Sequence, residues 1–529
     1  MKRLWVFLLI FFTYFLVQSI SIAYGAEWAK SYGTTGDEIA TFIQETSDGG
    51  YIVAGHVFFL AENSTEDFLV MKLDSKGNIV WQKTFGGESA DIAESIQQTI
   101  DGGYIVTGYS GGDFLVIKLD ANGNVVWQKT YGGENDDYPR SIQQTSDGGY
   151  IVAGHTAPIG TVGADALVIK LNANGNIVWQ KTYGGERDDF ARSIQQTKDG
   201  GYIVAGFRDT NERHWDVWIF KLDSNGTLIW EKIYGETGFD YAKSIQQTSD
   251  GGYIVAGHRL SFEIGVDEAL VLKLDSNGNI VWQKTYGGEL GYYVRSIQQT
   301  NDGGYIMAGY TYSFRQGPPD IWAVKLDNNG NIVWQKTYVG SFVEGYGASY
   351  GEAYSVKQTE DGGYIIAGKI WSSNPDNAWD VLVLKLNSEG NIPMCGYIYT
   401  TNATTRTPNL TGITQSTFAL STNFLGINFN GTAINSNLIS LEECYFPLIT
   451  VLRPNGGQHW NAGGSYVIKW DASSEAVKFK LFYSTDNQTT WNLIKGVGNV
   501  RQYKWTIPAQ DGKKPKSFEI GRASCRERV

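Results

Sequence analysis

The sequence predicts an all-β protein built around a seven-bladed β-propeller, followed by a linking region and a second β module. Three observations predict it. A unit of about 50 residues occurs seven times, each unit holds four strand-like runs, and one extra copy of the fourth run precedes the first unit. Four antiparallel strands at this spacing are typical of a propeller blade. The 64 glycines and 14% aromatic residues fit many short strands joined by tight turns.

Each unit contains the runs S-I-Q-Q-T, Y-I-V-A-G, L-V-x-K-L-D and I-V-W-Q-K-T. The D-G-G and x-x-G-N segments that join them supply glycines, which adopt the positive φ that a tight hairpin needs. The Y-I-V-A-G run is apolar without alternation, as expected for a strand buried on both faces. The tyrosine that opens this run marks the seven copies: Tyr51, Tyr104, Tyr150, Tyr202, Tyr253, Tyr305 and Tyr364.

The phase of the repeat predicts how the ring closes. Residues 27–33 copy the fourth run, whereas the seventh unit ends at Gly390 and Asn391 with no W-Q-K-T-Y after it. We therefore expect the N-terminal strand to complete the last blade, which leaves no exposed edge between the first and last blades. On this reading the propeller spans residues 26–392.

One tryptophan per blade stands on the predicted outer strand, at Trp28, Trp81, Trp127, Trp179, Trp230, Trp282 and Trp334. The D-x-x-G-N-x-x-W segment resembles the tryptophan-docking motif of quinoprotein-like or kelch-like propellers, with one residue fewer between Asp and Trp. The resemblance bears on fold, and it implies that each tryptophan packs one blade on the next rather than holding a cofactor.

The two ends of the chain carry segments that we expect to lie outside the folded domains. Lys2 and Arg3, the apolar run 4–17 and the small residues near Gly25 have the layout of a secretory signal peptide, residues 1–25. This predicts a secreted or cell-surface protein, with an uncleaved anchor as the alternative. Residues 519–529 match the translation of a sequencing adapter, so we expect the natural chain to continue past Phe518 and a missing C-terminal part to carry any membrane anchor.

Residues 393–447 are rich in Thr, Asn and Ser and are interpreted as a loosely stranded linking region. They contain Cys395 and Cys444. In an exported protein such a pair predicts a disulfide, and two unpaired buried thiols are the alternative.

Residues 448–518 resemble the Ser/Thr-rich, membrane-anchored family that is similar to the N-terminal domain of yeast cell-wall glucan-synthesis proteins. The residues that carry this resemblance are Pro454, Asn455, Gly456, Gly457, Trp460, Gly463, Ile468, Trp470, Tyr483, Ser484, Trp491, Trp505, Ile507 and Pro508. The resemblance implies an immunoglobulin-like β-sandwich, incomplete here, which serves as an accessory module with no assigned chemistry.

Candidate binding residues lie on the propeller. Four consecutive blades carry a cation just before the inner strand, at Arg140, Arg192, Lys243 and Arg295. We expect them at one mouth of the channel, where they could meet an anionic ligand such as an acidic glycan. Local ion pairs with Asp137, Asp189 and Asp240 are the simpler interpretation of these cations. Loop aromatics, chiefly Trp215, Trp371 and Trp379, would stack on sugars or on a protein partner, although single surface aromatics are common.

Other repeated polar residues have simpler interpretations. An aspartate ends every variable loop, which favours a turn-forming carboxylate over a ring of cation ligands. His56, His155 and His258 follow the Y-I-V-A-G run, but other blades place a tyrosine or phenylalanine there, so histidine is interpreted as a planar ring. We predict no metal site and no cofactor. The paired glutamines are expected to make the channel wall polar.

The net charge of -12 and the pI near 5.1 argue against a nucleic-acid partner. The sequence shows no nucleophile with an adjacent base and no isolated carboxylate pair. It therefore favours a secreted or cell-surface, non-enzymatic protein that binds a glycan or protein partner through the loop face of the propeller. A carbohydrate-active or quinone-type enzyme with its site over the channel and a structural spacer are the alternatives. Oligomeric state cannot be read from the sequence.

Overall fold

The computed structural model describes residues 27–392 except 35, 59–64, 88, 134, 158–162, 212–213, 236–237, 263–264, 289, 313–318, 339–349 and 373–377, and beyond residue 392 the backbone of the strands named below. Every regular element in this part of the chain is a strand. Within it, no helix is long and apolar enough to cross a membrane. The predicted signal peptide lies outside the described residues.

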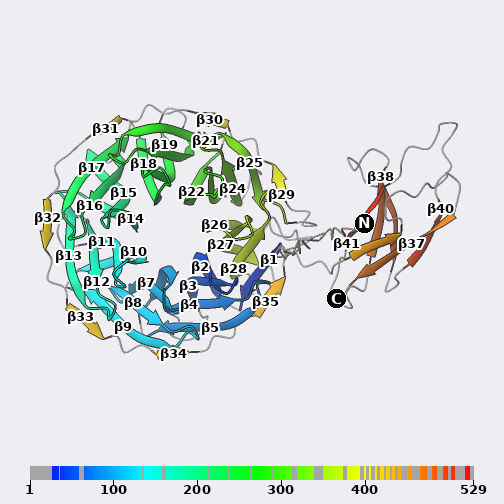
Figure 1. Cartoon of the computed structure of the whole chain (residues 1–529), viewed down its shortest axis with the longest axis horizontal. Helices are drawn as coiled ribbons and strands as arrows, with labels where there is room; N and C mark the ends of the chain where they lie inside the picture. Colours follow the sequence, from blue (N-terminus) through cyan, green and yellow to red (C-terminus); the bar gives the residue numbers. More distant parts are fainter. Residues whose placement is uncertain are drawn as a thin grey trace, which may run out of the picture.

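The repeats form seven antiparallel blades around a central opening, with the first strand of each blade innermost (Figure 1). Blade 1 consists of β2 (Asp37–Glu45), β3 (Tyr51–Phe58), β4 (Glu66–Leu73) and β5 (Ile79–Gly86). Blade 2 consists of β6 (Asp91–Gln98), β7 (Tyr104–Ser110), β8 (Asp113–Leu119) and β9 (Val125–Gly132). Blade 3 consists of β10 (Asp136–Gln144), β11 (Tyr150–Ala157), β12 (Asp165–Leu171) and β13 (Ile177–Gly184).

The remaining blades repeat this plan. Blade 4 consists of β14 (Asp189–Gln196), β15 (Tyr202–Asn211), β16 (His214–Leu222) and β17 (Leu228–Gly235). Blade 5 consists of β18 (Gly238–Gln247), β19 (Tyr253–Ser261), β20 (Asp267–Leu274) and β21 (Ile280–Gly287). Blade 6 consists of β22 (Tyr292–Gln299), β23 (Tyr305–Thr311), β24 (Asp320–Leu326) and β25 (Ile332–Tyr338). Blade 7 takes three strands from its own repeat, β26 (Gly351–Gln358), β27 (Tyr364–Ser372) and β28 (Ala378–Leu386).

The ring closes as the phase of the repeat predicts. Strand β1 (Trp28–Gly33) supplies the fourth strand of blade 7 and pairs antiparallel with β28, with Trp28 opposite Lys385 and Tyr32 opposite Val381. The first and last parts of the propeller are therefore held together by a main-chain ladder as well as by packing.

The segment that follows the propeller, interpreted from sequence as a loosely stranded linking region, pairs along the rim of the ring. It forms seven short strands, here called the belt, and each pairs antiparallel with the outer strand of one blade (Figure 1). The pairs are β29 (Ile398–Thr400) with β25, β30 (Thr404–Arg406) with β21, β31 (Thr411–Ile413) with β17, β32 (Phe418–Ser421) with β13, β33 (Leu425–Asn428) with β9, β34 (Thr432–Ile434) with β5 and β35 (Ile439–Glu442) with β1. An outer strand without a neighbour offers free N–H and C=O groups, which a passing segment can pair without any hydrophobic pattern of its own.

The belt meets the blades in reverse order, from blade 6 down to blade 1 and then blade 7. Its first and last strands therefore lie on adjacent blades. Strand β35 also covers β1, so the strand that closes the ring is not an edge. Cys395 and Cys444 lie outside the described residues, and their disulfide stays a prediction.

Beyond the belt, six strands form two three-stranded sheets. One contains β36 (Ile449–Arg453), β37 (Ser465–Ala472) and β40 (Gln502–Thr506), and the other contains β38 (Phe479–Ser484), β39 (Asn492–Val497) and β41 (Glu519–Ser524). Strand β41 pairs with β38, although the sequence placed residues 519–529 outside the module. An immunoglobulin-like sandwich stays a prediction for this module.

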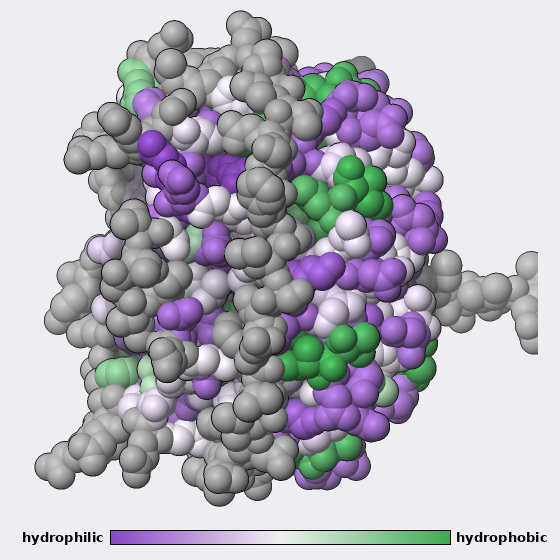
Figure 2. Space-filling model, turned by 90° about the vertical axis from the view of Figure 1, so that its left-hand side faces the viewer, coloured by the Kyte–Doolittle hydropathy of each residue, from purple (hydrophilic) through white to green (hydrophobic). Residues whose placement is uncertain are grey.

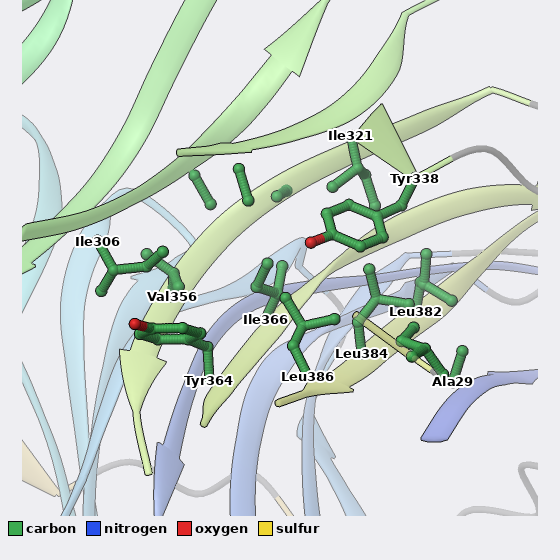
Figure 3. Packing of buried hydrophobic residues seen from close by; sticks show 14 of the residues in the cluster. Ala29, Ile306, Ile321, Tyr338, Val356, Tyr364, Ile366, Leu382, Leu384 and Leu386 are labelled. Carbon is green, nitrogen blue, oxygen red and sulfur yellow. The ribbon is translucent and has the colours of Figure 1, made fainter. Parts of the chain in front are cut away.

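The core consists of separate hydrophobic clusters, each shared by two neighbouring blades. Figure 3 shows the cluster between blades 6 and 7, where Ile306 and Ile321 face Ile366 and Leu384, and Ala29 of the closing strand joins them. This explains why the second and third runs are apolar on both faces, because each face packs against a different cluster.

The repeated tryptophans dock each blade on the next, as the resemblance implied. Trp28 Nε1 donates to the Ser75 carbonyl at 3.2 Å, and the Tyr32 hydroxyl donates to the Gly77 carbonyl at 2.6 Å. Gly77 has a φ of 75°, and a Cβ at this position would lie 2.7 Å from the Trp28 ring. Both the conformation and the close ring require glycine at this position.

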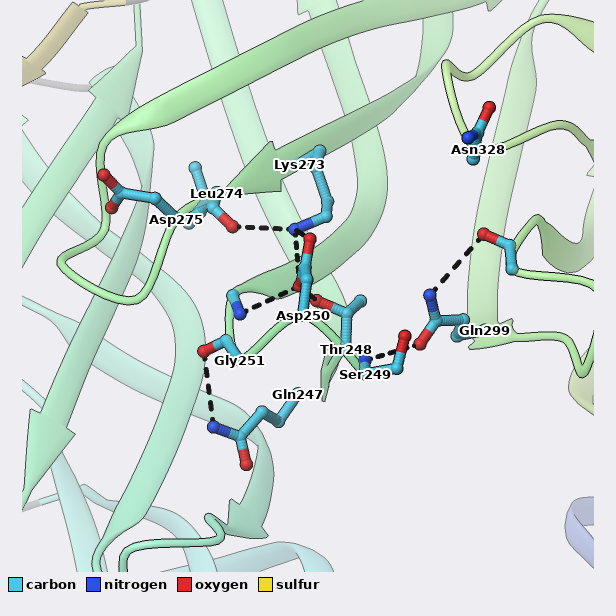
Figure 4. Close-up of polar contacts among 12 residues, drawn as sticks. Gln247, Thr248, Ser249, Asp250, Gly251, Lys273, Leu274, Asp275, Gln299 and Asn328 are labelled. Atoms are coloured by element: carbon cyan, nitrogen blue, oxygen red, sulfur yellow. Dashed lines mark hydrogen bonds and ion pairs between the residues drawn. The ribbon is translucent and has the colours of Figure 1, made fainter.

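Polar contacts hold the inner turns of neighbouring blades together (Figure 4). In blade 5, Lys273 Nζ donates to the Leu274 carbonyl at 3.0 Å and forms an ion pair with Asp250 at 2.9 Å. The Ser249 N–H donates to Gln299 Oε1 of the next blade at 2.8 Å. The second glutamine of the pair therefore bridges two blades rather than only making the channel polar.

Seen from the side, the outer surface is largely polar with small apolar patches repeated around the ring (Figure 2). Exposed apolar side chains recur at one position on the fourth strands of blades 1 to 6, at Val80, Val126, Val178, Ile229, Val281 and Val333. Such single residues are ordinary on protein surfaces.

Candidate functional site

A β-bulge in every inner strand directs one side chain into the channel. In β10 the register with β11 shifts between Pro139 and Ser141, so Arg140 is the extra residue. The same shift occurs in all seven inner strands. Bulges commonly redirect a side chain in this way. The bulge residues, here called the bulge ring, are Thr41, Glu94, Arg140, Arg192, Lys243, Arg295 and Tyr354, and all of them line one central cavity.

The cavity has a volume of about 740 Å³ and is lined by the inner strands. Its charged lining residues are Arg140, Arg192, Lys243, Arg295 and Lys357, against Glu45 and Glu94. Five cations and two carboxylates give this wall a formal charge of +3, although the whole chain carries -12. The channel wall is thus positive although the chain as a whole is negative.

The four predicted cations, here called the cation arc, lie together as expected, but in the channel wall rather than at its mouth. Among the described residues, no ion pair joins a member of the arc to the aspartate that precedes it in its blade, although the sequence favoured such pairs. Asp189 instead pairs with Arg208 at 2.6 Å, and Asp240 pairs with Arg259 at 3.4 Å. Each of these aspartates stands directly opposite its arginine in the strand register, which leaves the bulge residue of that blade out of the pair.

Within the described part of the chain, only one member of the cation arc has a carboxylate partner. Arg140 forms an ion pair with Glu94 of the neighbouring blade. Burial, together with the Arg140 and Arg295 charges, lowers the pKa of Arg192 to about 9. Burial and the charges of Arg192, Arg295 and Arg140 lower the pKa of Lys243 well below 10.5. The wall is therefore a site of uncompensated positive charge.

Nine aromatic and histidine side chains, here called the aromatic wall, form a continuous row of ring contacts. They are Tyr109, Tyr138, His155, Phe190, Phe207, Tyr241, His258, Tyr293 and Tyr310, with neighbouring ring centroids 4.5 to 5.1 Å apart. Several of these rings also contact cations of the arc. The cation of Arg192 lies 5.1 Å from the Phe207 centroid, and that of Arg295 lies 5.5 Å from the Tyr310 centroid. Such contacts hold buried cations in place without neutralising them.

His155 and His258 belong to this stack, which agrees with their interpretation as planar rings. Burial and the nearby Arg192 lower the pKa of His155 to about 2, so its imidazole is neutral at physiological pH. The described residues contain no group of three or more His, Cys, Asp or Glu side chains arranged to hold a metal ion.

Two of the predicted loop tryptophans, Trp371 and Trp379, lie in strands rather than in a loop, directly opposite each other near the ends of β27 and β28. The ring centroids of Trp371 and Trp379 are 5.3 Å apart, and Tyr350 lies 6.2 Å from each; we call the three the aromatic platform. Lys369 Nζ lies 4.2 Å from the Trp379 ring and 5.9 Å from the ring of Tyr354, a member of the bulge ring. Contacts therefore run from the platform into the channel.

The third predicted tryptophan lies at the opposite part of the arc, on blade 4. Trp215 is 5.3 Å from Phe207 and 5.5 Å from Phe190, the two rings on which Arg192 rests. Each end of the unpaired arc is thus linked to an indole ring, Arg192 through Phe207 to Trp215 and Arg295 through Tyr354 and Lys369 to Trp379.

Sequence reasoning missed Glu94, Tyr354 and Lys357. The first two were within reach, because they occupy the position before S-I-Q-Q-T in their own repeats. Lys357 replaces the first glutamine of the pair, and burial lowers its pKa to about 8. In the other blades this glutamine accepts the N–H of the second glutamine in the next blade, for example at 2.6 Å between Gln143 and Gln196.

Comparison with known families gives one match, between residues 50–155 and the family described as outer membrane protein assembly factor BamB. The match extends from β3 of blade 1 to β11 of blade 3, so it concerns the repeat and not the whole chain. No curated protein sequence matches the chain.

Solved structures that resemble the chain include the Pan2 WD40 domain of Neurospora crassa, at 12% identity and a TM-score of 0.40, covering 66% of this chain and 89% of that one. A Synechocystis apocarotenoid oxygenase mutant has 10% identity and a TM-score of 0.36, with 72% and 96% covered. Drosophila Plexin A in complex with Semaphorin 1b has 8% identity and a TM-score of 0.34, with 67% and 88% covered. These neighbours include both binding proteins and an enzyme, and at such scores they carry no argument about the channel.

Proposed function

We propose that this chain is a secreted or cell-surface binding protein whose propeller holds an acidic glycan, with a carboxylate on the cation arc and neighbouring sugars on the loop aromatics. The single observation that carries the proposal is the group Arg192, Lys243 and Arg295, which lines the cavity without a carboxylate partner among the described residues. Buried cations are normally paired, because removing a charge from water costs several kcal/mol.

An anionic ligand would relieve this unfavourable arrangement. Burial and mutual repulsion lower the pKa values of Arg192 and Lys243. A carboxylate placed among these cations would attract them and offset that repulsion. Guanidinium groups match the planar geometry of a carboxylate and bind it with two parallel hydrogen bonds. The cavity volume of about 740 Å³ falls within the usual range for small-ligand sites.

The aromatic residues favour a sugar over a simple inorganic anion. Trp371 and Trp379 form the platform on the loop side, and Trp215 lies beside Phe207 next to Arg192. Indole rings combine a large apolar face with a polar edge, which suits a ligand that is apolar on one face and rich in hydroxyls elsewhere. A uronic acid residue offers this face together with the carboxylate that the arc requires.

The experiment is calorimetric titration of the full chain with an oligogalacturonide and with a neutral oligosaccharide of the same length. We expect the acidic ligand alone to bind, and its affinity to fall as salt is raised. Arg192→Gln removes a charge-assisted contact worth about 1.5 to 3 kcal/mol, so binding should weaken about 10- to 100-fold.

Lys76→Gln is the matched control, because this exposed turn lysine is remote from the cavity lining. It should leave the affinity unchanged. Equal binding of the neutral oligosaccharide, or no binding of either sugar, would overturn the proposal. Binding of a protein partner that Arg192→Gln does not weaken would assign the function to the loops instead.

Export is the second part of the proposal. It is supported by Lys2, Arg3 and the apolar run 4–17. The mature protein should begin at Ala26, which N-terminal sequencing of the protein from its native host would establish. A protein that retains Met1 and stays with the cell interior would contradict it.

A further inference from the structure

Lys243 is the central member of the unpaired part of the cation arc. It is the bulge residue of β18, between Ala242 and Ser244, and it lines the cavity. Its Nζ lies 5.2 Å from the Phe207 centroid and 5.3 Å from the Tyr241 centroid. Arg192 on β14 and Arg295 on β22 occupy the same position in the two neighbouring blades.

The groups that face this amine are mostly cationic or neutral. Arg192, Arg295 and Arg140 all lower the pKa of Lys243, after burial, and only Glu94 acts in the opposite sense. His258, on the second strand of the same blade, is itself held neutral by burial and by the Lys243 and Arg295 charges. Asp240 of the same strand is engaged by Arg259. No carboxylate among the described residues forms an ion pair with Lys243.

An amine in this setting loses its proton more readily than an exposed lysine does, and in its neutral form it is a nucleophile. Lysines that are desolvated beside other cations lose their proton at neutral pH and attack carbonyl carbons. Lys357 offers a comparison within the same cavity, because its pKa is also lowered, to about 8. However, burial alone lowers it, and no guanidinium group takes part. Only Lys243 has an arginine on each side to hold the carboxylate of an incoming molecule.

We propose that Lys243 is a carbonyl-reactive amine that forms an imine with aldehydes or ketones that carry a carboxylate. The proposal rests on the proposed function, since the same arginines hold the anion. In the first step the neutral Nζ attacks the carbonyl carbon, and an N–H proton passes to the oxygen to give a carbinolamine. The C–O bond then breaks, and the hydroxyl leaves as water with the second N–H proton. The products are the imine and one water, with no oxidant or reductant consumed.

A uronic acid sugar in its open-chain form has this combination of aldehyde and carboxylate, so the reducing end of an acidic glycan is the natural reactant. Free 2-oxo acids share the chemistry. Glyoxylate, the smallest aldehyde with a carboxylate, is a suitable probe for both, and glycolaldehyde is its uncharged counterpart.

The test is to incubate the full chain with glyoxylate and sodium cyanoborohydride, which reduces an imine to a stable secondary amine, and to map the modified lysines by peptide mass spectrometry. Lys243 should react at least about 10-fold faster than the exposed Lys76, because each unit of lowered pKa leaves about 10-fold more free amine. The preference should be smaller with glycolaldehyde, which lacks the carboxylate that the arginines would hold, and should fall in Arg192→Gln. Lys243→Met should abolish the fast reaction, whereas Lys357→Met should keep it.

The outcomes separate this inference from the proposed function. If the oligogalacturonide binds but Lys243 reacts no faster than Lys76, the imine chemistry is refuted and the binding function stands. If Lys357 reacts in place of Lys243, the role of the flanking arginines is refuted. If neither binding nor modification occurs, both proposals fail. The comparison among lysines of the unmodified chain requires no variant, so a folding defect in Lys243→Met would not affect it.

Discussion

Replacing Asp137 by asparagine should make the propeller more stable at alkaline pH. Asp137 is completely buried on the inner strand of blade 3. Burial, and to a lesser degree the charge of Asp113, raise the pKa of Asp137 from 3.8 to about 7. The folded protein therefore prefers the neutral carboxyl.

The sign and size of the effect follow from the two pKa values. Below 3.8 the carboxyl is neutral in both states, and the free energy of unfolding does not depend on it. As the pH rises toward 7, the unfolded chain ionises first and becomes favoured. The complete loss is ~4 kcal/mol, of which about 3 kcal/mol falls between pH 5 and pH 8. Asparagine has no charge to lose, so the variant should lack this decline.

The assay is urea unfolding of the full chain and of Asp137→Asn at pH 5 and pH 8. We expect the variant to unfold at higher urea than the native chain at pH 8, with a smaller difference at pH 5. Asp120→Asn is the control, because the N–H groups of Asn122 and Asn124 lower the pKa of this turn aspartate. That variant should lose stability at pH 8. If Asp137→Asn shows the same pH dependence as the native chain, the reasoning is refuted.

Two further predictions concern the architecture. Because the belt begins on blade 6 and ends on blade 7, a Cys395–Cys444 disulfide would close it around the ring. Peptide mapping without reduction should find this pair, and its reduction should lower the free energy of unfolding by roughly 4 kcal/mol. Two thiols that can be alkylated without reduction would contradict it. Gly278→Ala places a Cβ 2.9 Å from the Trp230 ring at a φ of 75°, so we expect at least ~1 kcal/mol of lost stability in urea unfolding, and an unchanged midpoint would contradict the docking role of this turn.

Much of the propeller could be predicted because its determinants are local. The turn glycines, the doubly buried second strand and the phase of the first strand are each visible within one repeat or at one end of the array. A blade cannot bury its apolar faces alone, so the repeat itself requires neighbours on both sides. The membership of the cation arc was visible for the same reason, since a fixed position in the repeat becomes a fixed position around the ring.

The belt was not predicted because its strands pair with distant parts of the chain rather than within one repeat. Its strands have three or four residues each and pair through main-chain groups with edges that lie 60 to 412 residues away. The strands from β30 to β35 begin at intervals of seven residues, but this short spacing does not tell which edges they pair with. The aromatic platform is a similar case. Tyr350 precedes β26, while Trp371 and Trp379 flank the loop after β27, and only the fold brings the three together.

By itself, the sequence determined that seven similar blades form a closed ring and that four of them present a cation at one shared position. The tertiary structure alone decided that these cations are largely unpaired. Asp189 and Asp240 were available to neutralise them, but the strand register gives both to arginines of the second strand, and the bulge turns the arc toward the channel. Whether a charge is paired depends on distances of a few ångströms between strands, which residue spacing along a single chain does not set.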